Sequence, residues 1–228
     1  MTTYVDRRQS LNAPRPTFRQ RLFAWITAQG EADNNRMQDS HKRRVFQDIS
    51  GTVLEIGPGT GANLPYYPAG IQWIAVEPNP AMHTYLREKA GQYEIAADFR
   101  LGTAEQLDLP DSSVEAVVST LVLCSVADLD ATLQEVRRVL KPGGRFLFVE
   151  HVAAPKGTGV RRAQDLIQPL WTFVVDGCHP NRETWIALAN AGFETLDFDR
   201  WQQDGPVATP MIAGVATKAA RNEPHGRG

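Results

Sequence analysis

The chain has 228 residues, of which 42% are hydrophobic and 22% charged, and this composition excludes a fibrous or wholly disordered protein. Lysine and arginine number 24 against 26 aspartate and glutamate residues, so the net charge is −2. Nucleic-acid binding calls for a strong basic excess, so we expect no nucleic-acid partner.

The two cysteines, Cys124 and Cys178, are too few for a disulfide framework or a four-thiolate zinc site. Isolated thiols are typical of a reducing compartment. Residues 1–8 lack the apolar core of a signal peptide, and no run of about 18 apolar residues occurs. We therefore expect a cytoplasmic protein without a membrane-spanning helix.

The N-terminal region predicts an arm and two helices. Residues 1–16 are rich in proline and arginine and predict a flexible arm. Apolar residues at helical spacing predict a helix from Phe18 that ends at Gly30, and a second helix over 33–49. We interpret 17–50 as an N-terminal helical lid. A basic amphipathic helix on a membrane surface is the less favoured alternative.

Alternating strands and helices begin at Gly51. Strands are expected at 52–56, 71–76, 94–101, 114–120 and 145–152, and helices at 81–90 and 128–140. Residues 153–192 predict a helical insertion with helices at 160–175, kinked at Pro169, and at 182–191. Strands at 193–201 and 211–217 predict a hairpin, and 219–228 a disordered tail. The pattern indicates an α/β fold with a largely parallel sheet covered by helices on both faces.

The stretch from Val53 to Ala62 predicts a strand, a glycine-rich turn and a helix, which is a nucleotide-binding pattern. A dinucleotide is one candidate ligand, because Gly57-x-Gly59-x-x-Ala62 is followed by Glu77 at the expected distance. Three details argue against it. The Glu55 carboxylate gains nothing beside a pyrophosphate, Pro58 removes an N–H from the turn, and the Leu140–Gly144 turn has no role in the dinucleotide fingerprint.

In these motifs the sequence resembles the class I S-adenosylmethionine (SAM) methyltransferases. Glu55-x-Gly57-x-Gly59-x-Gly61 is similar to their first motif, and Glu77 to the acid that holds the ribose hydroxyls. Gly102–Glu105 is similar to their turn beside the adenine, and Leu140–Gly144 to their turn into the fifth strand. The resemblance implies a Rossmann-like seven-stranded sheet, a methyltransferase domain over 51–218, and SAM as co-substrate with no metal.

A narrower resemblance covers residues 34–217 and points to the thiol S-methyltransferases. It is carried by 61–63, 78–80, 120–126, 150–153 and 176–178. Two departures stand out: the animal enzymes begin with a hydrophobic anchor that residues 1–16 do not match, and His179 stands where an uncharged polar residue is expected.

The resemblance assigns cofactor contacts to a set of residues around the turn and the ends of the next strands. These are Glu55, Gly57, Pro58, Gly59, Gly61, Asn63, Glu77, Pro78, Thr103, Ala104, Glu105, Thr120 and Leu121. Two of them have a second interpretation, because Asn63 and Thr103 could each cap a following helix. Glu105 would then lie near a helix start.

The acceptor side is less defined. His151, at the end of the fifth strand, is a candidate general base, and Asp176 a second catalytic candidate. Trp25, Cys124, Trp171 and His179 are candidates for contact with the acceptor. Structural roles are open for all of them, since buried cysteines and aromatic residues commonly serve packing.

We predict methyl transfer from SAM to a small-molecule acceptor, with a thiol or sulfide favoured. C- or O-methylation of a quinone-like or lipid-like molecule is the alternative within this class, and a non-catalytic SAM-binding protein the alternative outside it. The sequence predicts no oligomeric state.

Overall fold

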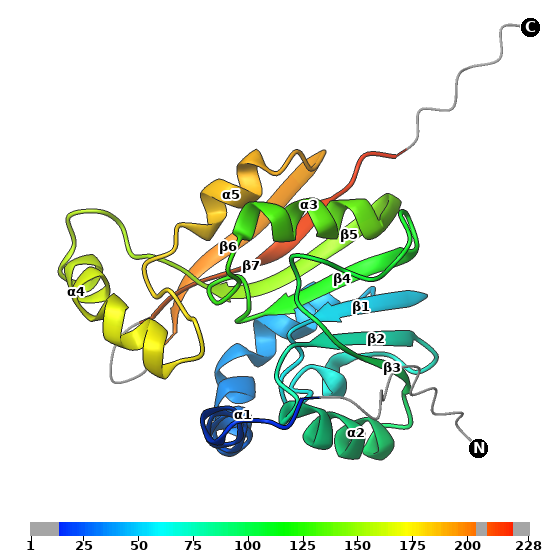
Figure 1. Ribbon diagram of the computed structural model, residues 1–228. Helices are drawn as coiled ribbons and strands as arrows, with labels where there is room; N and C mark the ends of the chain where they lie inside the picture. Colours follow the sequence, from blue (N-terminus) through cyan, green and yellow to red (C-terminus); the bar gives the residue numbers. More distant parts are fainter. Residues whose placement is uncertain (1–13, 204–208, 221–228) are drawn as a thin grey trace, which may run out of the picture.

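The computed structural model describes residues 14–203 and 209–220, so most of the predicted arm and tail lies outside the described residues. A seven-stranded sheet with the order β3-β2-β1-β4-β5-β7-β6 forms the centre of the protein (Figure 1). β7 runs antiparallel to β5 and β6, and the other neighbouring strands of this sheet are parallel. The strands are β1 Thr52–Ile56, β2 Gln72–Glu77, β3 Ala96–Leu101, β4 Val114–Thr120, β5 Leu140–His151, β6 Thr195–Gln203 and β7 Thr209–Thr217. The predicted α/β class, the seven strands and the β6–β7 hairpin are confirmed.

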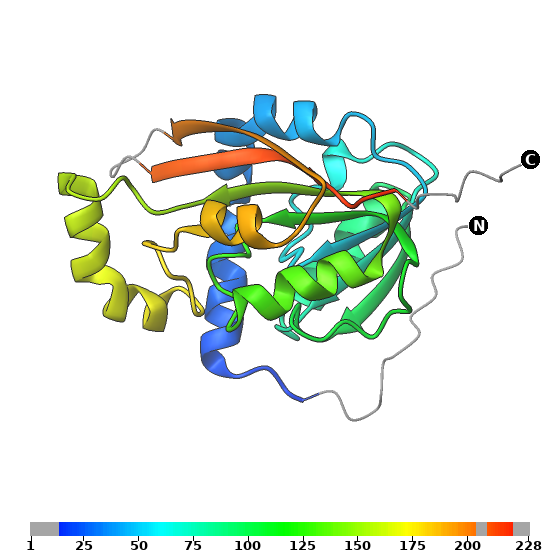
Figure 2. The ribbon, with the colours of Figure 1, turned by 90° about the horizontal axis from the view of Figure 1, so that it is seen from above.

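Helices cover both faces of the sheet, as the continuous apolar strands require (Figure 2). On one face, Phe46 at the end of α1 (Phe18–Phe46) and Leu86 of α2 (Met82–Gln92) pack in the same cluster as Trp73. On the other face, α3 (Leu129–Val139) and α5 (Thr184–Asn190) contribute Leu133 and Leu188 to a second cluster. The two clusters hold the strand ends in fixed positions.

The predicted break at Gly30 is wrong, because α1 is one helix of 29 residues. A capping box of Thr17 and Gln20 starts it. The next residue after Gly30, Glu31, accepts a hydrogen bond from the Thr60 hydroxyl and forms an ion pair with Lys89. A glycine inside a helix costs only about 1 kcal/mol of stability, and the cap before Gly30 and the Glu31 contacts after it outweigh this cost. The predicted lid is therefore a single long helix about 43 Å in length.

Two predicted helix starts are also wrong. After the glycine turn the chain forms only the three-residue 3₁₀ helix η1 (Leu64–Tyr66), and the Asn63 side chain makes no capping hydrogen bond. No helix follows Thr103, because the chain runs through turns to β4. Glu105 lies instead at the start of α3, where its Oε1 accepts a hydrogen bond from the backbone N–H of Ala127 at 2.7 Å.

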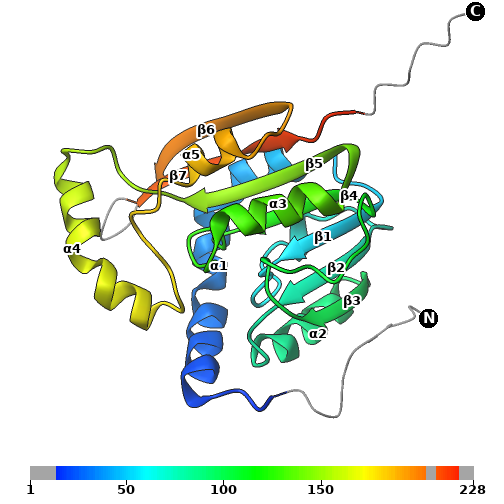
Figure 3. The same ribbon diagram turned by 45° about the horizontal axis from the view of Figure 1, so that its top comes forward.

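Helix α4 (Gly159–Val174) stands away from the sheet at the carboxyl end of β5 (Figure 3). Its one buried residue is Gln164, which hydrogen-bonds to the backbone of Val152 and Ala154. Much of its apolar surface is exposed, with Leu166 82% and Phe173 69% accessible. Within the described ranges, no helix is long and apolar enough to cross a membrane.

Candidate active site

A cavity of about 770 Å³ opens at the carboxyl ends of the parallel strands. This edge is where open α/β sheets bind their ligands, and β1 and β4 flank the point at which the strand order reverses. Helix α1 forms one wall, the glycine turn and the end of β2 form the floor, and α4 with the segment after it forms the far wall. The cavity size falls in the range of small-ligand sites.

The glycine turn brings bare backbone to the cavity. Gly57 and Gly59 have φ of +56° and +57°, a conformation that side chains disfavour. A Cβ on Gly57 would lie 2.6 Å from Cγ2 of Val122, so only glycine fits there. The Gly57 N–H donates to the Val76 carbonyl at 2.8 Å, which ties the turn to the neighbouring strand.

Glu77 ends β2 and reaches the same turn. Its Oε2 accepts from the Gly59 N–H at 3.0 Å and its Oε1 from the Asn79 N–H at 2.8 Å. Burial raises its pKa to about 7, because these hydrogen bonds do not fully replace lost hydration. Hydroxyl donors from a ligand would favour the ionised form, so the carboxylate suits a ribose.

Glu55, in β1, is 1% exposed and forms the other polar corner of the cavity. It accepts hydrogen bonds from Asn63 Nδ2 at 2.8 Å and from the Tyr67 hydroxyl at 2.7 Å. Burial raises its pKa. The Lys42 ammonium lines the same cavity, and burial lowers its pKa to about 8. Asn63 Oδ1 is buried without a protein partner. An acid, an amine and an open amide oxygen therefore surround one end of the cavity.

Predicted residues that follow β2 and β3 or end β4 line the cavity. They are Pro78 after β2, Thr103, Ala104 and Glu105 after β3, and Thr120 and Leu121 at the end of β4. The Thr120 hydroxyl accepts a hydrogen bond from Asn63 Nδ2 at 2.9 Å, which joins the end of β4 to the glycine turn. Burial raises the pKa of Glu105, but hydrogen bonds from backbone N–H groups outweigh this and keep it below the usual value.

Sulfur, imidazole and aromatic groups gather at the opposite end. His151 Nε2 lies 3.1 Å from Cys178 Sγ, and the Trp171 Nε1–H donates to the same sulfur at 3.3 Å. Cys124 and Asp176 also line this end. Burial lowers the pKa of His151, but its contact with Cys178 and the nearby Glu150 carboxyl together more than reverse this, so the pKa lies above its usual value. A hydrogen bond with Cys124, together with burial, raises the pKa of Cys178, which keeps it a neutral thiol.

Two non-glycine residues at this end have left-handed backbone. Leu121 has φ of +58° and Asp176 φ of +40°. Each such residue costs about 1–3 kcal/mol and persists only where the surroundings hold it, commonly at functional sites. The Leu121 N–H donates to the Val149 carbonyl at 3.0 Å, and the Asp176 carboxylate pairs with Arg19 of α1 at 3.4 Å.

Three predicted site residues do not line the cavity. Gly61 supports the turn from behind, because a Cβ there would lie 2.9 Å from Leu64 Cδ1. Trp25 is 55% exposed on a different face of α1 from the cavity-lining Phe23 and Thr27. The His179 N–H donates to the Cys124 carbonyl at 2.9 Å, and its ring lies beside Arg182.

Comparison with known proteins identifies the family. The model of a methyltransferase domain matches residues 54–148. The chain is 39% identical over 214 residues to thiol S-methyltransferase TMT1B of Rattus norvegicus, with 86% of each chain covered. It is 38% identical over 200 residues to thiol S-methyltransferase TMT1A of Homo sapiens, with 81% of each covered. The chain belongs to the same methyltransferase family as these two relatives.

The methyltransferase also matches the solved structure of the [4+2]-cyclase SpnF, with a TM-score of 0.65 and 20% identity. The match covers 82% of this chain and 81% of that one. At this identity the likeness shows the fold alone. The predicted class I SAM-dependent methyltransferase is confirmed by the family, and its Rossmann-like sheet by the solved folds.

Sequence reasoning missed one residue that lines the cavity, Lys42, and two that support its walls, Glu150 and Arg182. Asn35, Gln38 and Lys42 are spaced by three and four residues, which places them on one face of a helix. This spacing is the sequence signal that could have identified Lys42. Glu150 is fully buried and accepts hydrogen bonds from the backbone N–H groups of Val122 and Leu123 at 3.2 Å. Arg182 has no sequence signal.

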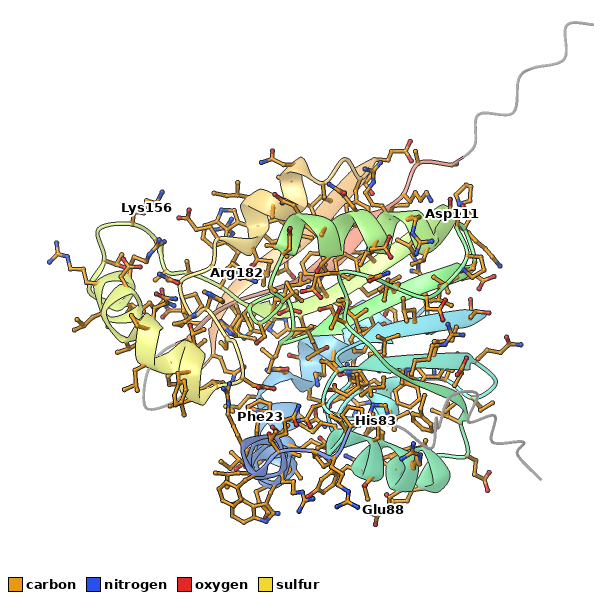
Figure 4. All side chains as sticks on the ribbon, in the orientation of Figure 1. Phe23, His83, Glu88, Asp111, Lys156 and Arg182 are labelled. Atoms are coloured by element: carbon orange, nitrogen blue, oxygen red, sulfur yellow. The ribbon has the colours of Figure 1, made fainter. Side chains whose placement is uncertain are left out.

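Arg182 lies on the segment that returns from α4 (Figure 4). Its guanidinium donates to the carbonyls of Leu123 and Val126 at 2.8 and 2.7 Å. Together Glu150 and Arg182 fix the loop that carries Cys124.

Proposed function

We propose that the protein transfers the methyl group of SAM to the sulfur of a small thiol or to sulfide. The observation that carries this proposal is one continuous cavity with two chemically different ends. One end offers a ribose-binding acid and groups for an amino acid, and the other offers sulfur, imidazole and apolar side chains. The thiol acceptors in the names of the 38–39% identical relatives give further support.

SAM would lie with its adenosine against Glu77, Thr103 and Ala104 and its methionine tail toward Glu55. The ionised Glu77 would accept hydrogen bonds from the ribose hydroxyls. Asn63 Oδ1, buried without a protein partner, and Glu55 suit the tail's ammonium, while the Lys42 ammonium suits its carboxylate. Groups of both signs therefore fit a zwitterionic tail, whereas they would not fit a pyrophosphate.

Methyl transfer needs an acceptor sulfur in line with the bond that breaks. The sulfonium is already activated, so the protein's main contribution is to hold the two reactants together, which can supply several kcal/mol. Ile167 and Trp171 of α4 line the far end and would contact the acceptor's carbon chain. Such contacts discriminate chains by about 1–3 kcal/mol per methylene.

The acceptor thiol must also lose its proton, because a free thiol is only a few per cent ionised at neutral pH. His151 lies at the acceptor end of the cavity, where a general base is needed, and its role as general base stays a prediction. Its Nε2 is already in contact with Cys178 Sγ. Asp176 faces the same space, but its ion pair with Arg19 suits it better to hold α1 against the far wall.

A lipid-like or quinone-like acceptor is the second candidate, and the surface around the cavity favours it. Phe18 and Trp25 of α1 are 81% and 55% exposed, and Leu170 and Phe173 of α4 are each 69% exposed. Arg19 lies over the Phe173 ring at 5.3 Å from its centroid, so the two helices adjoin. An apolar molecule could reach the cavity along this surface.

A panel of acceptors tests the proposal. The purified protein is incubated with SAM and, in turn, an alkyl thiol, sulfide, a phenol and a quinol, and S-adenosylhomocysteine is measured. We expect product with the thiol or sulfide. Product with only the phenol or quinol would transfer the function to the second candidate. SAM binding without product from any acceptor would indicate a non-catalytic SAM-binding protein.

We also propose a cytoplasmic location. Cell fractionation and flotation with anionic vesicles test it together. Recovery of the protein with the vesicles, and loss of that recovery in Phe18→Ser/Leu170→Ser, would place it on a membrane surface instead.

A further inference from the structure

Three metal-ligating side chains meet at the acceptor end of the cavity. Cys124 comes from the loop after β4, His151 from the end of β5, and Cys178 from the segment after α4. One ligand atom of each lies within 4.8 Å of the other two. All three residues line the cavity, although both cysteines are less than 5% exposed to bulk solvent. No other such triad of His, Cys, Asp or Glu donors occurs in the part of the chain that the structure describes.

The ligand atoms lie within 4.8 Å of one another, so side-chain adjustments of about 1 Å or less would bring them to the spacing of tetrahedral zinc. Zn–S bonds of about 2.3 Å and Zn–N bonds of about 2.0–2.1 Å separate neighbouring ligand atoms by roughly 3.4–3.8 Å. The His151 Nε2–Cys178 Sγ separation of 3.1 Å needs only a small expansion to admit the ion. Two cysteines and one histidine make a three-ligand set, which is the kind that leaves a fourth position open for a substrate.

The surroundings suit two thiolates. The Trp171 Nε1–H already points at Cys178 Sγ, at 3.3 Å. The Ser125 hydroxyl lies 3.4 Å from Cys124 Sγ and could donate to it. The guanidinium charge of Arg182 interacts with both cysteine side chains, which partly offsets the lowering of the Arg182 pKa by burial. In the metal-free cluster the His151 Nε2 atom is already in contact with Cys178 Sγ, at 3.1 Å.

We propose that Cys124, His151 and Cys178 bind one Zn²⁺ ion whose fourth position faces the cavity and takes the sulfur of the acceptor thiol. This inference rests on the proposed function for the identity of the fourth ligand. It differs from the sequence-based expectation of no metal, because the three donors converge only in the folded chain. The sequence has just two cysteines, and both belong to this cluster.

The chemistry of the step balances without an oxidant or reductant. Zn²⁺ displaces the two cysteine thiol protons, which leave to water. The acceptor thiol then coordinates and loses its own proton to water, since a metal ion lowers the pKa of a bound thiol. A lone pair of that sulfur attacks the SAM methyl carbon and forms the new C–S bond. The sulfonium C–S bond breaks, and its electron pair stays on the sulfur of S-adenosylhomocysteine.

Cobalt(II) titration tests the site directly. The full chain, without a polyhistidine tag, is reduced with a phosphine, freed of metal with a chelator, and titrated with Co²⁺. We expect one equivalent to bind, with a thiolate-to-cobalt charge-transfer band and the visible bands of tetrahedral Co²⁺. Zn²⁺ should displace it. An alkyl thiol added afterwards should increase the charge-transfer band, because a third sulfur joins the ion.

Variants locate the site. Cys124→Ser/Cys178→Ser should lose the charge-transfer band, and His151→Gln should weaken Co²⁺ binding at least tenfold while both cysteines remain. His41→Asn is the matched control, because His41 stacks on Trp201 away from the cavity, and it should bind Co²⁺ as the parent does. Calorimetry with SAM shows whether each variant is folded at the cofactor end.

The outcomes separate this proposal from the proposed function. Absence of the charge-transfer band in the parent protein, or its persistence in the double serine variant, would overturn the metal site. A band unchanged by the alkyl thiol would overturn the open fourth position. Thiol methylation at full rate by chelator-treated protein would sink the zinc proposal and leave the proposed function intact. Co²⁺ binding together with methylation of only a phenol or quinol would support the metal site and contradict the proposed thiol acceptor.

Discussion

The two ends of the cavity are built at different distances along the chain. At the cofactor end, the hydrogen bond between Gly59 and Glu77 joins residues 18 apart. At the acceptor end, His151 meets Cys178 across 27 residues, and Arg19 meets Asp176 across 157. The centre of the first end is one strand–turn–strand unit, to which α1 adds Lys42 and the end of β4 adds Thr120. The second end is assembled from an N-terminal helix, two strand ends and a helical insertion.

In one fold, therefore, the main cofactor contacts come from residues close together in the sequence, whereas the acceptor contacts come from distant segments. Backbone conformation and buried carboxylates dominate the cofactor end. Side-chain identity on α4 and its flanking segments dominates the acceptor end. Val122 connects the two ends, because its side chain fills the space that a Cβ on Gly57 would need and its backbone belongs to the loop that carries Cys124. Substitutions at one end should therefore leave the other end largely unchanged, unless they act at this contact.

The largest expected effect is at Gly57. Gly57→Val places a branched side chain against Val122 at a positive φ, so the turn must move, and we expect SAM affinity in calorimetry to fall at least 100-fold. Gly70→Ala is the control for backbone strain alone, because φ there is +87° and no atom lies within 4 Å of the added Cβ. It should bind SAM normally. Unchanged affinity in Gly57→Val would refute the role of the turn.

The next effect is the pH dependence of SAM binding. The pKa of Glu77 is about 7 in the free protein, and ribose hydroxyls favour its ionised form. The carboxylate is mostly protonated at pH 6 and mostly ionised at pH 8, so the SAM dissociation constant should be roughly tenfold higher at pH 6. Glu77→Gln removes this titration. Its affinity should be low and should lack the Glu77-dependent change, and an identical pH profile in both proteins would rule Glu77 out.

A smaller effect is expected at the acceptor end. Ile167→Ala removes part of a cavity wall, and the KM of a long-chain thiol should rise about fivefold, which corresponds to about 1 kcal/mol. SAM affinity should not change. Leu166→Ala is the matched control on the same helix, because Leu166 is 82% exposed and does not line the cavity. A fall in SAM affinity in Ile167→Ala would contradict the independence of the two ends.

The smallest effect is expected at Asp176. Its ion pair with Arg19 is partly exposed, and such pairs are worth about 0–1 kcal/mol. Asp176→Asn should raise the acceptor KM about twofold with kcat unchanged, and Arg19→Gln should do the same because it breaks the same pair. A 100-fold loss of kcat in Asp176→Asn alone would instead show that the carboxylate takes part in the chemistry.

The α/β class, the seven strands, the glycine turn and the acid at the end of the next strand were all predictable from the sequence. Short apolar strands, glycines in a turn and an acid at the next strand end are local patterns, and neighbouring parallel strands bring them together without further information. The sequence was misleading where tertiary contacts overrode the low helix propensity of a glycine. Gly30 did not end α1, because contacts of Glu31 and the N-terminal capping box hold the helix on both sides.

Only the tertiary structure decided what the acceptor end contains. The hydrogen bonds of Glu150 and Arg182 to one loop, and the meeting of Cys124, His151 and Cys178, depend on how α4 and the segment after it pack around the strand ends. The packing of α1 likewise brings Lys42 to the cofactor end. No periodic pattern records such contacts, since each side chain is one residue in an unrelated segment. The physical reason is that long-range packing places these groups, whereas hydrogen-bonded strands and turns place the cofactor site.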